Sequence, residues 1–131
     1  MSTNSTVAVK TDKGYEAIYV HWDGYFDYMY PMLSENHNSL EQAMTLVSFG
    51  DASSIEKRIM PTNGSGHSFE KPEADVCVFY HRDRGERWEY VAPQTYRTKK
   101  EVLKTQYYTY IFEDGMWRAY IGGKEVDSYD Y

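Results

Sequence analysis

The sequence contains a single cysteine, Cys77, among its 131 residues, and it lacks any long apolar run. One cysteine cannot form an internal disulfide, and such usage fits a reducing cytoplasm. Cys77 lies in a short apolar run over residues 76–80 that predicts a buried strand. No stretch approaches the ~20 apolar residues that span a bilayer, and residues 1–6 lack the apolar core of a secretory signal. We therefore expect a cytoplasmic protein with no membrane partner.

Positive charge is also in short supply. The chain has 14 Lys and Arg against 20 Asp and Glu, which gives a formal net charge of -6. A broad nucleic-acid interface needs clustered basic side chains that neutralise phosphates, so we expect no nucleic-acid partner, although local basic patches are compatible with this balance. An acidic surface that imitates DNA is an alternative, but the Asp and Glu residues are spread along the chain rather than massed.

Familiar catalytic motifs are missing as well. The sequence contains no P-loop, GxGxxG, HExxH, CxxC or GxSxG pattern, and these motifs mark the common nucleotide-binding, zinc-protease, redox and hydrolase sites. The common enzyme classes are therefore disfavoured, and we expect neither a cofactor nor a bound metal.

Aromatic residues are abundant instead, at 17% of the chain with 14 tyrosines. Tyrosine combines a large apolar ring with a polar tip, so it suits half-buried positions on a sheet or at an interface. One interpretation is a small sheet packed mainly by tyrosine, and the other is a tyrosine-rich recognition surface. With 41% hydrophobic residues, a chain of this length is expected to form one core.

The order of apolar runs and turn residues predicts a single α+β domain over residues 14–131. Residues 1–13 are rich in Ser and Thr and lack periodicity, so we expect them to form a disordered leader. The domain should contain a mostly antiparallel sheet of four to six strands, with two or three helices packed on one face. The predicted strands are residues 16–22, 75–81, 87–91, 107–112 and 116–121.

The predicted connections and helices rest on local turn and capping patterns. The second and third strands are expected to pair about a charged turn at residues 82–86, and the last two about Asp114-Gly115. Residues 61–72 should form an exposed loop. One helix is predicted over residues 27–35, with Asp27 as the cap and with Pro31 tolerable only in the first turn. Two more helices are predicted to begin at capping boxes. These boxes are Ser39-Leu40-Glu41-Gln42, with Leu40, Ala43, Met44 and Val47 on one face, and Thr98-Lys99-Lys100-Glu101.

Two predicted strand ends carry the same His-x-Asp pattern, at His21 and Asp23 and at His81 and Asp83. The two-residue period of a strand places the His and the Asp of each pair on one face. If the two strands are neighbours, the four side chains could hold a divalent metal or act as acid and base on a phosphoester. These four are our candidate catalytic residues. The alternative is that the histidines are half-buried and hydrogen-bonded to nearby carboxylates.

Arg82 and Arg84 lie in the charged turn between the predicted strands, and together with Tyr25 they are our candidate ligand-binding residues. Two arginines on one turn can grip a phosphate or a carboxylate bidentately. The turn also contains acidic residues, so its groups could instead satisfy one another, and exposed ion pairs of that kind contribute little stability.

Three blocks of the chain resemble a family of small uncharacterised proteins carried by bacteriophages and prophages, over about residues 17–121. Here Phe26 follows the first block where the family is expected to have proline, and Pro31 falls inside the predicted helix. The resemblance carries over no activity and no functional residues. The blocks are Tyr19-Val20-His21-Trp22-Asp23-Gly24-Tyr25, Gly50-Asp51-Ala52-Ser53-Ser54 and Tyr80-His81-Arg82-Asp83-Arg84-Gly85-Glu86.

The resemblance implies a biological setting, that of a small phage protein, rather than an activity. Small phage proteins without catalytic motifs more often bind a host protein than catalyse a reaction, which is an argument by association. We therefore expect a non-catalytic phage accessory protein that binds and modulates a host protein in the host cytoplasm, in host takeover or anti-defence. The alternative is binding or hydrolysis of a nucleotide or another phosphorylated small molecule at the His/Asp/Arg cluster. A homodimer is a further option, because an exposed aromatic sheet edge invites pairing.

Overall fold

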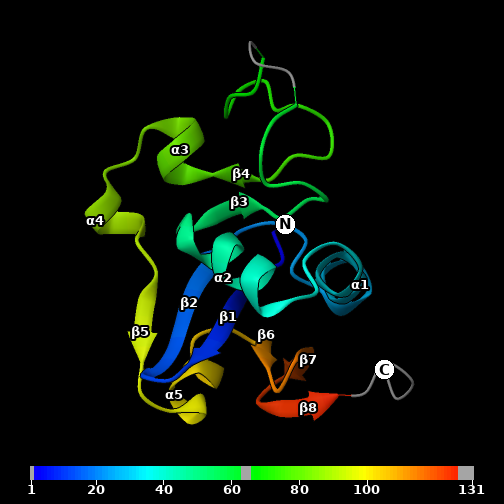
Figure 1. The fold of residues 1–131 in the computed structure, drawn as a ribbon, viewed down its shortest axis with the longest axis vertical. Coiled ribbons are helices and arrows are strands. Elements are labelled where there is room, and N and C mark those ends of the chain that lie inside the picture. Colours follow the sequence, from blue (N-terminus) through cyan, green and yellow to red (C-terminus); the bar gives the residue numbers. More distant parts are fainter. Residues whose placement is uncertain (1, 63–65, 127–131) are drawn as a thin grey trace.

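A computed structural model describes residues 2–62 and 66–126 and shows an α+β fold built on one mixed sheet (Figure 1). The strands are β1 (Ser5–Thr11), β2 (Gly14–Val20), β3 (Ala52–Ser54), β4 (Val78–Phe79), β5 (Gln94–Tyr96), β6 (Tyr108–Glu113), β7 (Met116–Ile121) and β8 (Lys124–Val126). The helices are α1 (Phe26–Asn36), α2 (Leu40–Ser48), α3 (Tyr80–Arg84), α4 (Trp88–Val91) and α5 (Lys99–Leu103).

Seven of the eight strands follow the order β4-β3-β2-β1-β6-β7-β8, and the eighth, β5, pairs with the part of β2 that β3 leaves free. The pairs β1/β6 and β2/β3 are parallel, and the other pairs are antiparallel. The predicted α+β class with a mostly antiparallel sheet is thus confirmed, but the sheet has more strands than the four to six expected. Four of the strands were not predicted. β3, β5 and β8 are only three residues long, too short to show an alternating pattern, and β1 lies in the segment predicted to be a disordered leader.

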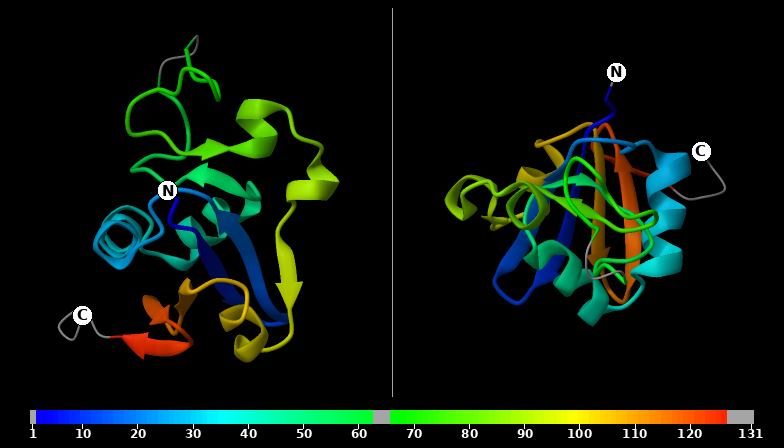
Figure 2. Two further views of the ribbon diagram at one scale, coloured as in Figure 1. Left: turned by 180° about the vertical axis from the view of Figure 1, so that it is seen from behind. Right: turned by 90° about the horizontal axis from the view of Figure 1, so that it is seen from above.

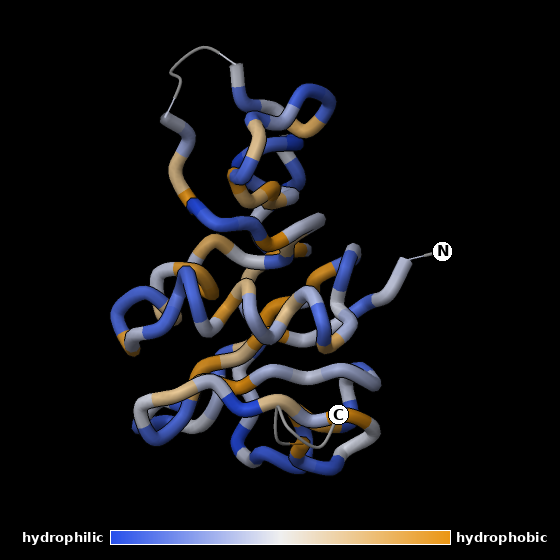
Figure 3. The backbone as a smooth tube through the Cα atoms, turned by 90° about the vertical axis from the view of Figure 1, so that its right-hand side faces the viewer, coloured by the Kyte–Doolittle hydropathy of each residue, from blue (hydrophilic) through white to orange (hydrophobic). Residues whose placement is uncertain are grey.

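The sheet buries apolar side chains on both faces. Val7 and Val9 of β1 pack with residues of α1 and α2, whereas Ala8, which points to the opposite face, packs with Val102 of α5. Figure 2 shows these helices on the two sides of the strands, and in Figure 3 the hydrophobic stretches run through the middle of the molecule. The prediction that the helices pack on one face is therefore wrong.

The prediction of a disordered leader over residues 1–13 is wrong for β1, which is a central strand. It pairs along its whole length with β2 and in parallel with β6. Val7 and Ala8 are fully buried, and the hydroxyl of Thr6 lies 2.6 Å from that of Thr105. A strand covered on both faces has no alternation of polar and apolar residues, so its Ser and Thr content was misleading.

The predicted hairpin over residues 75–91 is also wrong. Only β4 is extended, and α3 and α4 occupy the positions of the charged turn and the second strand. The Asp83 carboxylate accepts a hydrogen bond from the Phe79 amide at 2.8 Å, which secures the first turn of α3, and Gly85 ends this helix with a φ of 82°. Local capping by Asp83 thus outweighed the aromatic and β-branched composition of the segment.

Elements with clear caps or turn residues form as predicted. Ser39 caps α2 by accepting from the Gln42 amide, and Thr98 and Glu101 form the capping box of α5. Asp114 and Gly115 both have positive φ angles, as the tight turn between β6 and β7 requires. The buried face of α2 differs from the prediction, because Leu46 replaces two residues that are exposed, Leu40 and Met44.

Helix α1 covers the predicted range, but its start differs in detail. The cap is Tyr25, which makes no capping hydrogen bond through its side chain, and Asp27 lies in the first turn. Pro31 lies in the helix interior rather than in the first turn, where a proline removes one intrahelical donor. Met29 and Leu33 are fully buried in the core that α1 shares with the sheet, and this burial holds the helix in place.

Candidate functional site

The three blocks singled out in the sequence meet in space at the open end of β2. The backbone amides of His21 and Trp22 donate to the carbonyls of Ala52 and Ser53 at 3.0 and 2.9 Å. The Tyr80 amide donates to the Asp51 carbonyl at 3.2 Å, where α3 begins. Figure 1 shows β2, β3 and the β4–α3 segment side by side in this region. Backbone hydrogen bonds therefore bring the three blocks side by side, although they lie far apart in the chain.

Asp51 occupies the centre of this region, on the β2 edge between β3 and β5. Its Oδ1 atom accepts from the Tyr19 amide at 2.9 Å, and its own amide donates to the Val91 carbonyl at 2.8 Å. Burial raises the pKa of the Asp51 carboxyl from 3.8 to about 6, although the hydrogen bond from Tyr19 favours the ionised form. Asp51 thus changes its charge close to neutral pH.

Two tyrosines lie near this carboxyl group, and a histidine contacts one of them. The Tyr19 hydroxyl lies 2.7 Å from Nδ1 of His21. Burial, followed by the charges of Tyr80 and Asp51, raises the pKa of Tyr19. Burial also raises the pKa of Tyr80, against the opposing effect of its hydrogen bond with Ser53. Both phenols therefore stay protonated at neutral pH and offer hydrogen-bonding groups beside a carboxyl group.

Two partly exposed tryptophans flank these polar groups. The rings of His21 and Trp22 meet edge to face at 4.8 Å, and those of His81 and Trp88 lie 5.1 Å apart. Trp22 and Trp88 expose 45% and 40% of their surface. We call this surface the aromatic edge and define it by its members, Tyr19, His21, Trp22, Asp51, Tyr80 and Trp88.

Gly50 lets α4 approach this edge closely. Its φ of 84° is unfavourable for other residues, and a Cβ atom here would lie 2.4 Å from the Val91 carbonyl oxygen and 3.1 Å from the Trp88 ring. The glycine therefore brings Trp88 next to Asp51.

The structure does not bring the four candidate catalytic residues together. His21 belongs to the aromatic edge, Asp23 lies in the following turn with a φ of 57°, and His81 contacts the Glu86 carbonyl through Nδ1 at 2.8 Å. Asp83 points into the protein and is 4% exposed. Over the described residues, no three His, Cys, Asp or Glu side chains form a group that could hold a metal ion. The second pair lies on a helix, where residues two apart point in different directions.

Arg82 is occupied within the protein. Its Nε and Nη2 atoms donate to the two oxygens of Asp83 at 2.9 and 3.0 Å, Nη1 donates to the Ile59 carbonyl at 2.7 Å, and Nη2 also reaches the Cys77 carbonyl at 2.9 Å. A guanidinium group has five N–H donors, and further contacts are with Nε2 of His67 at 3.3 Å and the Met60 sulfur at 4.0 Å. Arg82 therefore ties the loop that follows β3 to α3.

His67 completes this internal cluster. Its Nε2 atom lies 3.2 Å from Oδ2 of Asp83, and its Nδ1 atom accepts from the Glu73 amide at 3.0 Å. Burial alone would raise the pKa of Asp83, but the hydrogen bonds from Arg82 and the Phe79 amide hold the pKa below its usual range. The arrangement supports a structural role for Arg82, Asp83 and His67.

The other two candidate binding residues lie apart. The Arg84 guanidinium stacks over Phe69 at 4.8 Å and pairs with Glu86 at 3.5 Å. Tyr25 is 41% exposed, and its ring lies 6.2 Å from that of Tyr28 at the start of α1.

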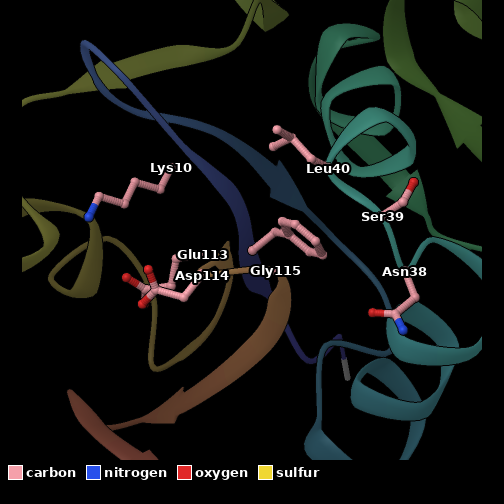
Figure 4. A pocket seen from close by; sticks show the side chains of 8 residues that line it. Lys10, Asn38, Ser39, Leu40, Glu113, Asp114 and Gly115 are labelled. Atoms are coloured by element: carbon pink, nitrogen blue, oxygen red, sulfur yellow. The ribbon is translucent and has the colours of Figure 1, made fainter.

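A pocket of about 470 Å³ lies between the end of β1, the α1–α2 connection and the β6–β7 turn (Figure 4). Its polar residues are Lys10, Asn38, Ser39, Glu113 and Asp114. In Figure 4 the carboxylates of Glu113 and Asp114 lie on the side away from Asn38 and Ser39. Glu113 is 4% exposed and engaged by Lys99 and Tyr120 at 2.9 and 2.8 Å. Its carboxylate therefore holds α5 to the sheet and is not open to a ligand.

Sequence reasoning missed Asp51, Ser53 and Trp88 as site residues. The Gly50-Asp51 pair is part of one sequence block, but no neighbouring residue indicates that the Asp51 carboxyl group fills a gap on the β2 edge. Trp88 was assigned to a strand, and its place beside Gly50 depends on contacts between distant segments.

Comparison with protein-family models finds no matching family, and comparisons with curated proteins and with solved structures find no significant match. The longest helix, α1, has 11 residues, and none of the helices in the described part of the chain is both long and apolar enough to cross a membrane.

Proposed function

We propose that this chain is a non-catalytic phage accessory protein that binds a host protein through the aromatic edge, in the host cytoplasm. The observation that carries the proposal is the convergence of all three sequence blocks on one surface with two partly exposed tryptophans, Trp22 and Trp88. Exposed tryptophan and tyrosine rings supply much of the binding energy in protein interfaces.

The chemistry of the edge favours a basic partner surface. Asp51 provides a carboxyl group whose charge acts on Tyr19, and the chain as a whole carries a net charge of -6. Arginine side chains stack on aromatic rings and pair with carboxylates, and opposite net charge speeds association. A host protein that presents arginines is therefore the partner that this edge suits.

The test compares tagged wild-type protein with the double variant Trp22→Ala and Trp88→Ala in affinity capture from host lysate. The control is Tyr107→Ala, which removes a ring that is 64% exposed on another part of the surface. We expect one stoichiometric host protein with the wild type and the control. Binding of that purified protein by the double variant should be weaker by at least about 30-fold, since the loss of even one central tryptophan costs roughly 2 kcal/mol or more. Equal binding by the double variant, or loss with Tyr107→Ala alone, would contradict the proposal.

A further inference from the structure

A second hollow lies between α5 and the turn that joins β7 to β8, away from the aromatic edge. It has a volume of about 490 Å³, within the roughly 300–1,000 Å³ of small-molecule sites. Figure 1 shows α5 beside the start of β8. We call this hollow the lysine pocket; it is lined by Lys99, Lys100, Leu103, Lys104, Gly122 and Gly123.

The pocket concentrates positive charge on a protein that is acidic overall. Lys99 is neutralised by Glu113 at 2.9 Å. Lys100 and Lys104 are exposed, and neither forms an ion pair with any residue that the structure describes. The two lie four residues apart, Lys100 within α5 and Lys104 at its C-cap, a spacing at which like charges repel each other. Two unneutralised ammonium groups therefore face the same hollow.

No acidic side chain on α5 compensates for these lysines. Glu101, the one acidic residue of the helix, directs its carboxylate to the other side, where Oε1 accepts from the amides of Arg97 and Thr98 at 3.1 and 3.0 Å. In β8, which follows the facing turn, Glu125 is paired with Arg118 at 2.9 Å. The charge of Lys100 and Lys104 thus remains available to an anion.

The remaining lining residues leave room for a ligand. A Cβ atom added to Gly123 would meet no atom within 4 Å, so the backbone of the turn is open at this position. A Cβ atom at Gly122 would lie 3.0 Å from the ring of Tyr107, which supports the turn from the far side. Leu103 adds an apolar side chain to the lining. Such a pocket can accept both an anionic and an apolar part of one molecule.

We propose that the lysine pocket binds a phosphate-bearing small molecule of nucleotide size. The ammonium groups of Lys100 and Lys104 contact the phosphate oxygens, as lysines do in other phosphate sites. Leu103 and the glycine turn contact the non-phosphate part. This site is independent of the aromatic edge, so its test neither supports nor weakens the proposed protein-binding function.

The experiment measures the fluorescence anisotropy of labelled adenosine triphosphate titrated with the full chain at low salt. We expect saturable binding, and about tenfold weaker binding for each of the variants Lys100→Gln and Lys104→Gln, because each removes one charge-assisted contact. The matched control is Lys71→Gln, an exposed lysine elsewhere on the chain, which should leave the affinity unchanged.

A second matched pair tests the turn. Gly123→Asp and Gly123→Asn have similar backbone preferences, since both residues tolerate a positive φ, but only the former adds a negative charge. We expect Gly123→Asp to lose more than tenfold in affinity relative to Gly123→Asn. Competition by pyrophosphate but not by adenosine would support recognition of the phosphates. Absence of saturable binding, unchanged affinity in both lysine variants, competition by adenosine alone, or far tighter binding of a single-stranded oligonucleotide would overturn the proposal.

Discussion

The carboxyl group of Asp51 offers the sharpest test of the chemistry at the aromatic edge. Its pKa is raised from 3.8 to about 6 by burial, so the folded protein disfavours the charged form. Between these two pH values the folded state binds more protons than the unfolded state, and stability therefore falls as pH rises from about 4 to about 6. Above that range the full cost of ionised Asp51 is present, and below it the cost is absent.

Replacing Asp51 by asparagine removes this cost but keeps an oxygen that can accept from the Tyr19 amide. Each tenfold change in an ionisation constant corresponds to about 1.4 kcal/mol, so the shift from 3.8 to about 6 corresponds to about 3 kcal/mol. Because Asp51 is partly exposed and solvent screens its charge, we expect Asp51→Asn to raise the free energy of unfolding by about 1–2 kcal/mol at pH 8.

The assay is urea denaturation of wild type and Asp51→Asn at pH 8 and at pH 4. The gain should shrink to near zero at pH 4, where both side chains are neutral in the folded protein. Asp12→Asn is the control, since Asp12 is exposed, and it should change stability by less than about 0.5 kcal/mol at either pH. Destabilisation by Asp51→Asn at pH 8 would refute the reasoning, because it would mean that the ionised carboxylate is favourably paired.

Two further predictions concern the internal cluster of Arg82, Asp83 and His67, and Gly50, which precedes Asp51. Arg82→Leu should lower the free energy of unfolding by about 3 kcal/mol or more, because it leaves buried Asp83 without its ion pair to Arg82. The control Arg87→Leu breaks an exposed ion pair and should change the free energy of unfolding by less than about 1 kcal/mol. Urea denaturation of both variants tests this prediction, and equal effects would contradict it. Gly50→Ala should lower the thermal unfolding temperature more than Gly85→Ala. The φ angles of the two glycines are similar, 84° and 82°, but only the Cβ atom at position 50 would clash, at 2.4 Å from a carbonyl oxygen of α4. A larger drop in unfolding temperature for Gly85→Ala would refute the packing described.

Features that depend on a few neighbouring residues were predictable from the sequence. Ser39 and Thr98 each cap a helix through the amide three residues away, and Asp114-Gly115 fixes the hairpin turn by its own backbone angles. Such signals act within one segment, so no knowledge of the rest of the fold is needed.

Features that depend on distant segments were not predictable in this way. β1 is a strand because Ser5 pairs with Val20 on one side and with Tyr108 on the other, and neither pairing is visible in its polar start. The candidate site shows the same limit. The blocks around His21 and Asp51 were recognised, but the contacts that bring Asp51 under Tyr19 arise only when β2 and β3 pair.

The central claim is that the aromatic edge contacts a host protein, and site-specific photocrosslinking in the host cell tests it most directly. Trp88 would be replaced by the photoreactive residue p-benzoylphenylalanine, with the same replacement at Tyr107 as the control, because both positions are exposed but only the first belongs to the edge. The account predicts a single crosslinked host protein from position 88 and none from position 107. Crosslinking of the same host protein from position 107 but not from position 88 would contradict it.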